Sequence, residues 1–365
     1  MISTYHREVA HGQDCSRHCL HFYQNCILEQ GNSGRFFLVR NSLWAKNSLL
    51  LIIGETRSYG FSSLIDDLWR IVMSRVRSSA IHIGALNIVL QPHTPHKYIE
   101  LLQLMARHKF DALVRGDDAL LLGSCRYLNP EKPLEGVRGD IYKFLKLDST
   151  EAWFNTEVMD AATEDEIAEI NIPDNLKPHF KKFQYIFIPQ GHRFYFISSK
   201  PKHSLSAGLV KRFFETVFQR EEFAEFGALN VTIQPDPSGL SELLSLKRIS
   251  VLRMEIDRPN PDDLEDMEAE VLKRLNSLNA RSEKIEFMEA SNEGLRPDAF
   301  VTALAAVAND NGYVAVEGRD DTGLKKYMST KNMPLHETAK YNPNLTSEFD
   351  ALYDKVIEIH REIAR

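Results

Sequence analysis

Apolar positions recur in two nearly identical segments of the chain. Residues 84–92 read GALNIVLQP and residues 227–235 read GALNVTIQP, so six of nine letters agree and the other three are aliphatic or β-branched. Such runs are typical of β-strands with a buried face. The pattern predicts two related strands in two related sheet halves. Chance similarity between two strands rich in Val, Ile and Leu is the alternative.

Each copy is followed by the same predicted order of elements. After the first copy, residues 93–109 predict a helix that starts at Thr94 and Pro95, and residues 110–128 predict strands on both sides of a Gly-Asp-Asp turn. After the second copy, residues 236–249 predict a short helix and residues 250–259 an alternating strand. We therefore expect an α+β fold with two related strand-helix-strand units and antiparallel hairpins, followed by a helical C-terminal part.

The remaining periodic segments complete this outline. They are a hairpin over 178–200 with its turn at 189–191, a helix that begins at Ser206, a long helix over 262–280, a helix over 296–310, a hairpin around 320–323 and an amphipathic helix over 346–365. The predicted domains are an extension (1–72), a first α+β unit (73–150), an acidic linker (151–176), a second α+β unit with the hairpin (177–258) and a C-terminal part (259–365).

Residues 1–72 differ from the rest of the chain. They contain three of the four cysteines and show little periodicity. We interpret Met73 as the natural start and residues 1–72 as a poorly ordered upstream extension of the reading frame. The alternative is a small subdomain with strands over 35–44 and 47–54 and a helix over 62–76. Its Cys and His residues lack the spacing of a zinc finger, so we expect no metal site there: Cys15, His18, Cys19, His21 and Cys26.

Composition narrows the class of protein. Hydrophobic residues make up 43% and charged residues 26%, as in ordinary globular proteins, and the net charge is −7. No apolar run reaches the roughly 18 residues of a membrane span, and the start lacks a signal-peptide core. Four cysteines do not make a disulfide framework. We therefore expect a cytoplasmic protein without a membrane partner.

Charge is strongly segregated in the middle of the chain. Residues 151–176 carry eight acidic side chains and no Lys or Arg, whereas residues 177–220 carry nine Lys or Arg against one acid, Glu215. The basic segment interleaves aromatic residues: Tyr185, Phe187, Phe194, Tyr195 and Phe196. Basic side chains neutralise phosphates and rings stack on unpaired bases, so this segment predicts nucleic-acid binding.

The residues expected to contact phosphates are Lys181, Lys182, Arg193, Lys200, Lys202, Lys211 and Arg212. Binding is expected to be DNA binding without sequence specificity, because no major-groove reading motif is present. Two other interpretations stay open. The rings form a hairpin core with lysines on its solvated face, or the basic segment pairs with the acidic one.

Candidates for catalysis are weak. Glu317, Asp320 and Asp321 resemble part of a metal-nuclease carboxylate cluster, but Asp and Gly also favour tight turns. His93 and His96 are awkwardly spaced as metal ligands because Pro95 lies between them. The chain lacks a Walker loop, a Rossmann glycine fingerprint and a Gly-x-Ser-x-Gly elbow. We expect no cofactor and no resident metal.

Several stretches from Ala85 onward resemble an uncharacterised bacterial family described only as a domain of unknown function. They include ALNIVLQPHTPHKYIELL, VRGDDALLLGS, PLEGVRGDIYKF and EIDRPNPDDLEDMEAEVL, and together they cover roughly residues 85–335. The family has no established active site, so the resemblance assigns no functional residue. Its members begin near the first strand, which supports Met73 as the start. The order of elements is also similar to that of RexA and KwaB-type phage-defence proteins, by fold-level analogy alone.

Three functions follow from these observations. The first is a DNA-binding protein, with a role in phage defence implied by the analogy. The second is a metal-dependent nuclease that uses Glu317, Asp320 and Asp321. The third is a scaffold subunit that forms a homo-oligomer, or binds a partner protein, through the helices at 262–280 and 346–365.

Overall fold

The computed structural model describes residues 78–147, 152–170, 172–259 and 266–363, together with the backbone of three short strands near the start. The chain divides into two compact units, Met1–Val76 and Arg77–Arg365. The first unit contains an antiparallel sheet of β1 (Cys26–Gln30), β2 (Phe36–Arg40) and β3 (Leu50–Ile52). Two of these strands lie where the alternative subdomain has them. The helix predicted over 62–76 and the Cys and His residues at 15–21 lie outside the described residues.

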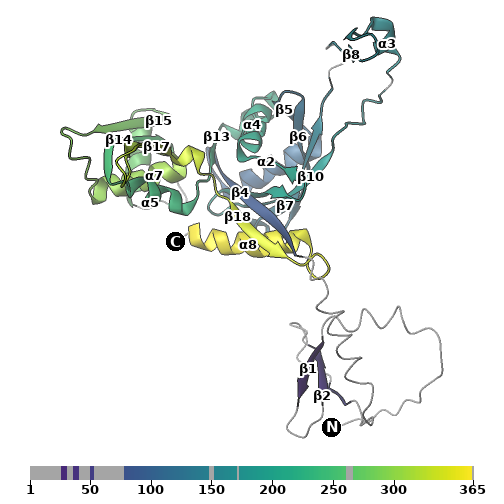
Figure 1. Cartoon of the computed structure of the whole chain (residues 1–365), viewed down its shortest axis with the longest axis horizontal. Helices are drawn as coiled ribbons and strands as arrows, with labels where there is room; N and C mark the ends of the chain where they lie inside the picture. The colour runs from purple at the N-terminus through teal and green to yellow at the C-terminus, as the bar shows by residue number, and fades with distance from the viewer. Residues whose placement is uncertain are drawn as a thin grey trace. The chain divides into compact units, whose positions relative to one another are not determined.

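A large antiparallel sheet dominates the second unit (Figure 1). Among the described residues its order is β13-β4-β11-β10-β7-β6-β5, with β12 added to β11 and β18 added to β4. The strands are β4 (Ser79–Gln91), β5 (Asp111–Arg115), β6 (Asp118–Tyr127), β7 (Val137–Leu145), β10 (Lys181–Ile188), β11 (Arg193–Lys200), β12 (His203–Ser204), β13 (Ala228–Ile233) and β18 (Glu337–Tyr341).

The two repeated segments form neighbouring strands of this sheet. β4 and β13 pair antiparallel, with Ala228 opposite Gln91 and Ile88 opposite Val231. Ile88 and Val231 are the fifth, and therefore the central, residues of the two nine-residue copies. The copies thus pair with their centres opposite each other. The two strands are therefore related by an approximate two-fold axis that passes between these residues.

Helices cover both faces of the large sheet. Tyr98 of α2 (Pro95–His108) packs on Phe187, and Phe214 of α4 (Ala207–Val217) packs on Phe194. Phe187 and Phe194 are paired residues, so α2 and α4 lie on the same face. α8 (Glu348–Ile363) covers the opposite face, with its buried side chains against β4, β10, β11 and β18 (Figure 1).

The start of α2 confirms the helix signal in the sequence. Thr94 has extended backbone angles at the N-cap position and Pro95 occupies the first turn. Lys109, in the left-handed conformation, ends the helix, and its N–H donates to the carbonyl of Met105. The two strands predicted around the Gly-Asp-Asp turn follow as β5 and β6.

A second sheet follows, in the order β15-β14-β16-β17. Its strands are β14 (Arg248–Asp257), β15 (Ser282–Met288), β16 (Gly312–Arg319) and β17 (Lys325–Ser329). The helices packed with it are α5 (Pro237–Leu244), α6 (Asp266–Ser277) and α7 (Ala299–Asn311). The described part of this unit also contains the 3₁₀ helices η1 (Pro133–Glu135), η2 (Glu221–Phe226) and η3 (Thr330–Asn332).

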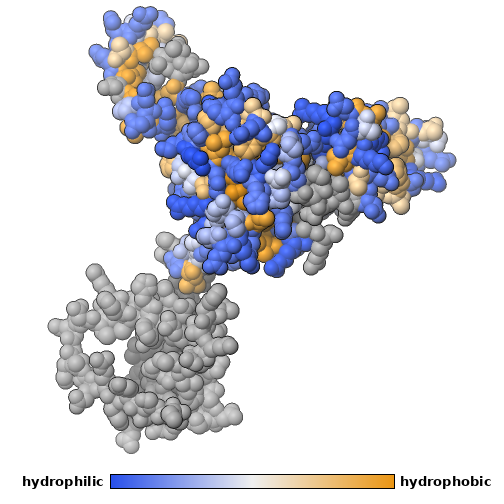
Figure 2. All heavy atoms as spheres, turned by 180° about the vertical axis from the view of Figure 1, so that it is seen from behind, coloured by the Kyte–Doolittle hydropathy of each residue, from blue (hydrophilic) through white to orange (hydrophobic). Residues whose placement is uncertain are grey.

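The acidic segment inserts between β7 and β10. It contains the short strands β8 (Phe154–Asn155) and β9 (Asp160–Ala161) and one short helix, α3 (Glu164–Ala168). A capping box between Thr163 and Glu166 starts this helix. Apolar side chains of the segment reach its surface, among them Phe154, Val158 and Met159 (Figure 2).

None of the described helices has both the length and the apolar character that crossing a membrane requires. The molecule is a mixed α+β protein with antiparallel sheets and a C-terminal helix, as the sequence predicts.

Candidate functional site

Four of the predicted phosphate contacts lie at one end of the large sheet. β10 begins with Lys181 and Lys182, and the antiparallel β11 ends at Lys200, so these residues share the open end of the hairpin. Lys202 follows in the tight turn to β12, which pairs Lys200 with His203. We call Lys181, Lys182, Lys200 and Lys202 the lysine end of the sheet.

The four lysines of the lysine end differ in their ion-pair partners. Lys182 Nζ lies 3.1 Å from the Asp140 carboxylate, and Lys200 Nζ lies 2.8 Å from the Glu348 carboxylate at the start of α8. Lys181 and Lys202 form no ion pair with any described residue. Within the described residues, Lys182 and Lys200 thus pair with the sheet and α8, and none of the four lysines pairs with the acidic segment.

The other three predicted contacts lie elsewhere. Arg193 begins β11 at the turn end of the hairpin and donates to the carbonyl of Gly191. Lys211 and Arg212 are on α4, where Lys211 faces Glu215 and Arg212 donates to the carbonyl of Val114. The structure therefore brings four of the seven residues together and separates three.

The stacking role given to the aromatic residues is wrong. All five rings are buried, with exposed fractions of 1% or less: Tyr185, Phe187, Phe194, Tyr195 and Phe196. Phe194 packs against Phe214, and the Tyr185 hydroxyl donates to the carbonyl of Ser124. Alternation along a hairpin with helices on both sides of the sheet buries both faces, so these rings cannot reach a base.

Two of the three carboxylates considered for catalysis make structural contacts in the second sheet. Glu317 on β16 pairs with Arg253 of β14. Asp320 accepts from the Thr322 hydroxyl and from the N–H groups of Thr322 and Leu324, and these hydrogen bonds, with that of the Thr322 side chain foremost, lower its pKa. Asp321 is exposed. No group of three or more His, Cys, Asp or Glu side chains within the described ranges is arranged to hold a metal.

Two of the histidines meet at a buried tyrosine. His93 Nδ1 lies 2.8 Å from the Tyr98 hydroxyl, which accepts from the N–H of Leu90. The His192 ring lies against both residues and is only 2% exposed. Burial, followed by repulsion from His93 and Arg193, lowers the pKa of His192 to about 3.

Sequence reasoning missed the role of the polar letters of the repeat. Asn87 and Gln234 both reach Asp310 at the end of α7: Asn87 donates to its carbonyl at 3.2 Å and Gln234 to its carboxylate at 3.5 Å. The symmetry-related Asn230 and Gln91 reach the end of β14. Asn230 hydrogen-bonds the Asp257 carboxylate, and Gln91 accepts from Arg258 at 3.3 Å. The sequence signal for this role was the Asn and the Gln, four residues apart, that are present in both copies of the repeat.

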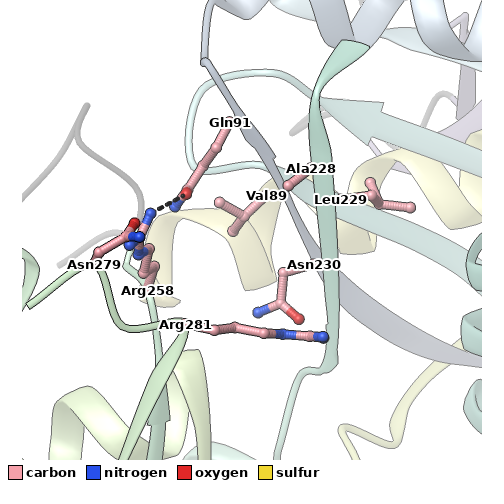
Figure 3. Close-up of a pocket in the computed structure, with 8 residues that line it drawn as sticks. All are labelled: Val89, Gln91, Ala228, Leu229, Asn230, Arg258, Asn279 and Arg281. Atoms are coloured by element: carbon pink, nitrogen blue, oxygen red, sulfur yellow. Dashed lines mark hydrogen bonds between the residues drawn. The ribbon is translucent and has the colours of Figure 1, made fainter. Parts of the chain in front are cut away.

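These contacts leave a cleft of about 320 Å³ beside the end of β4 (Figure 3). Val89 and Gln91 of β4 and Asn230 of β13 form one side. Arg258, just after β14, and Arg281, just before β15, form the other. Arg258 donates through Nε to the carbonyl of Ala280 at 2.7 Å, which orients its guanidinium.

The chain matches the family DUF4747, whose description is a domain of unknown function, over residues 79–357, and it belongs to that family. This span confirms the resemblance seen in the sequence and extends it at both ends. No curated protein matches the chain.

Proposed function

We propose that this member of the DUF4747 family binds DNA through the phosphate backbone, with the lysine end of the sheet as its contact surface. The observation that carries the proposal is the convergence of four lysines from two strands and a turn, two of which have no ion-pair partner among the described residues. Lysine binds phosphate as a point charge and requires no base contact.

The segment before β10 brings another lysine near this end. The carbonyl of Pro178 accepts from the N–H of Leu145 at the end of β7, so the exposed Lys177 lies beside the start of β10. Phosphates that displace Asp140 from Lys182 and Glu348 from Lys200 would replace one anionic partner by another. The proposed binding is therefore independent of sequence and sensitive to salt.

Charge reversal tests this proposal in the full chain. Fluorescence anisotropy with a labelled DNA duplex of about 20 base pairs and with the matching single strand would measure binding at low salt. The variant Lys181→Glu with Lys202→Glu removes the two unpaired lysines, and we expect at least about tenfold weaker binding. Arg296→Glu with Lys325→Glu makes the same change of charge at exposed positions outside the lysine end and should leave binding within about twofold.

Equal weakening in the two variants would show that only the total charge matters, and absence of binding by the unmodified protein would refute the proposal. The role in phage defence stays a prediction.

A further inference from the structure

The cleft of Figure 3 has the chemistry of an anion site. Two arginines line it, and none of the described residues that line it is acidic. Arg258 uses Nε and one Nη for the carbonyl of Ala280 and the amide of Gln91, which leaves further guanidinium N–H groups to donate. Arg281 is exposed and makes no hydrogen bond or ion pair with any described residue, although its charge acts through space on the Asp257 carboxylate.

The loop that carries these groups has a fixed shape. After α6, Asn279 adopts the left-handed conformation with φ of 49°, and the N–H of Ala280 donates to the carbonyl of Leu275. This is a common way to end a helix. The Ala280 carbonyl accepts from Arg258, and the residues on either side of Ala280 in the chain, Asn279 and Arg281, both line the cleft. Arg258 is thus held in place by the fold itself.

The opposite side offers amides and apolar surface. Asn230 and Gln91 present side-chain amides, and Val89 and Leu229 present aliphatic carbons. A cleft of about 320 Å³ is at the small end of the range for small-molecule sites, about 300–1,000 Å³. An isolated phosphate would leave the amides and the aliphatic wall uncovered.

We propose that this cleft binds a small phosphorylated ligand of mononucleotide size. The phosphate lies between Arg258 and Arg281, because guanidinium groups match phosphate oxygens in geometry. The remainder of the ligand lies along Val89 and Asn230, where amides can hydrogen-bond a heterocycle. This site is independent of the proposed DNA contact, because it lies at the end of β4 that is remote from the strand pairing next to Lys200.

Isothermal titration calorimetry of the full chain tests the site with four kinds of probe. They are the nucleoside 5′-monophosphates of A, G, C and U, the corresponding nucleosides, inorganic phosphate and sulfate. We expect at least one monophosphate to bind at least tenfold more tightly than its nucleoside and than inorganic phosphate. Arg258→Gln and Arg281→Gln should each weaken that binding at least tenfold. Arg107→Gln, an exposed arginine on α2, removes the same charge and should leave it unchanged.

Arg281→Gln is the decisive variant, because its side chain makes no hydrogen bond with the described part of the chain. Its thermal unfolding should match that of the unmodified protein. Undiminished binding in this variant would overturn the proposal. Absence of binding by every monophosphate, or equal binding of inorganic phosphate, would also overturn it. The variant Lys181→Glu with Lys202→Glu should bind the monophosphate normally, so failure of the DNA proposal and failure of this one are distinguishable.

Discussion

At the scale of single residues, buried polar groups account for the most specific contacts of this fold. The repeat twice brings an Asn of one copy and a Gln of the other to the same place. Asn87 and Gln234 meet at Asp310, and Asn230 and Gln91 meet at the end of β14. Asn87 and Gln234 are buried, and hydrogen bonds to buried amides are costly to leave unmade, so these contacts favour one position of the second sheet against the first. The apolar letters of the repeat alone would not provide this specificity.

His192 predicts a dependence of stability on pH. Its folded pKa of about 3 lies below the usual 6.5, because the ring is buried near His93 and Arg193. Between these values the unfolded chain binds a proton that the folded chain does not, so stability falls as the pH is lowered through this window. The loss is at most about 2 kcal/mol between pH 7 and pH 5.

Urea unfolding at both pH values measures this loss, and His192→Asn should show less of it than the unmodified protein. The exposed His96→Asn serves as the control and should keep the original dependence. An unchanged dependence in His192→Asn would contradict the assignment.

The ion pair between Asp118 and Lys143 predicts that replacing its carboxylate by an uncharged amide strongly destabilises the fold. Lys143 Nζ lies 2.8 Å from the Asp118 carboxylate, and its side chain is 8% exposed. Asp118→Asn leaves the ammonium buried without a carboxylate, so we expect a loss of about 3 kcal/mol in the free energy of unfolding. Adding Lys143→Met should recover most of it. Asp117→Asn, at the exposed neighbour, should cost less than about 0.5 kcal/mol.

At the scale of elements, sequence periodicity identified those with strong local signals. The hairpin of β10 and β11 and the pair β16 and β17 have clear turns, and α2 has its Thr-Pro start. Among the described strands of five or more residues in the second unit, three were missed. β7 contains a glycine, β15 follows a helical pattern without a turn signal, and β18 is a short polar strand at the sheet edge. Such strands are specified by their partners and not by their own residues.

The two glycines that open the repeat are expected to respond differently to alanine. Gly227 has φ of +81°, and a Cβ there would lie 2.0 Å from the carbonyl oxygen of Gln91. At Gly84 the nearest atom would be the ring edge of Phe196 at 3.0 Å. Gly227→Ala should therefore destabilise the protein by at least about 1–2 kcal/mol, and by more than Gly84→Ala. Chemical unfolding of both variants measures the difference, and equal effects would contradict the pairing of β13 with β4.

The C-terminal helix is expected to act within the chain. Leu352 and Val356 of α8 are fully buried against the large sheet, and Lys355 pairs with Glu337 of β18. Leu352→Ala should lower the free energy of unfolding by about 2–5 kcal/mol. Sedimentation should show the same oligomeric state for the variant and the unmodified protein. A change of state without loss of stability would instead place this face in a subunit interface.

At the scale of the whole molecule, the sequence predicted only in part where the lysines and the aromatic rings of the hairpin lie. The local excess of lysine was visible, and its gathering at one end follows from the hairpin. The sequence could not show that the rings are inaccessible. The second face of the hairpin is covered by α8, which comes from a segment about 150 residues later in the chain. Long-range packing decides which side of an alternating strand is solvated.

The measurement that tests the DNA-binding account most directly is the salt dependence of binding by the full chain. Anisotropy titrations of labelled duplex across a range of salt concentrations give the slope of the logarithm of the association constant against that of the salt concentration. Contacts from the four lysines predict a slope of about −3 to −4, reduced by about two units in Lys181→Glu with Lys202→Glu. A slope near zero, or one that this variant leaves unchanged, would contradict the account.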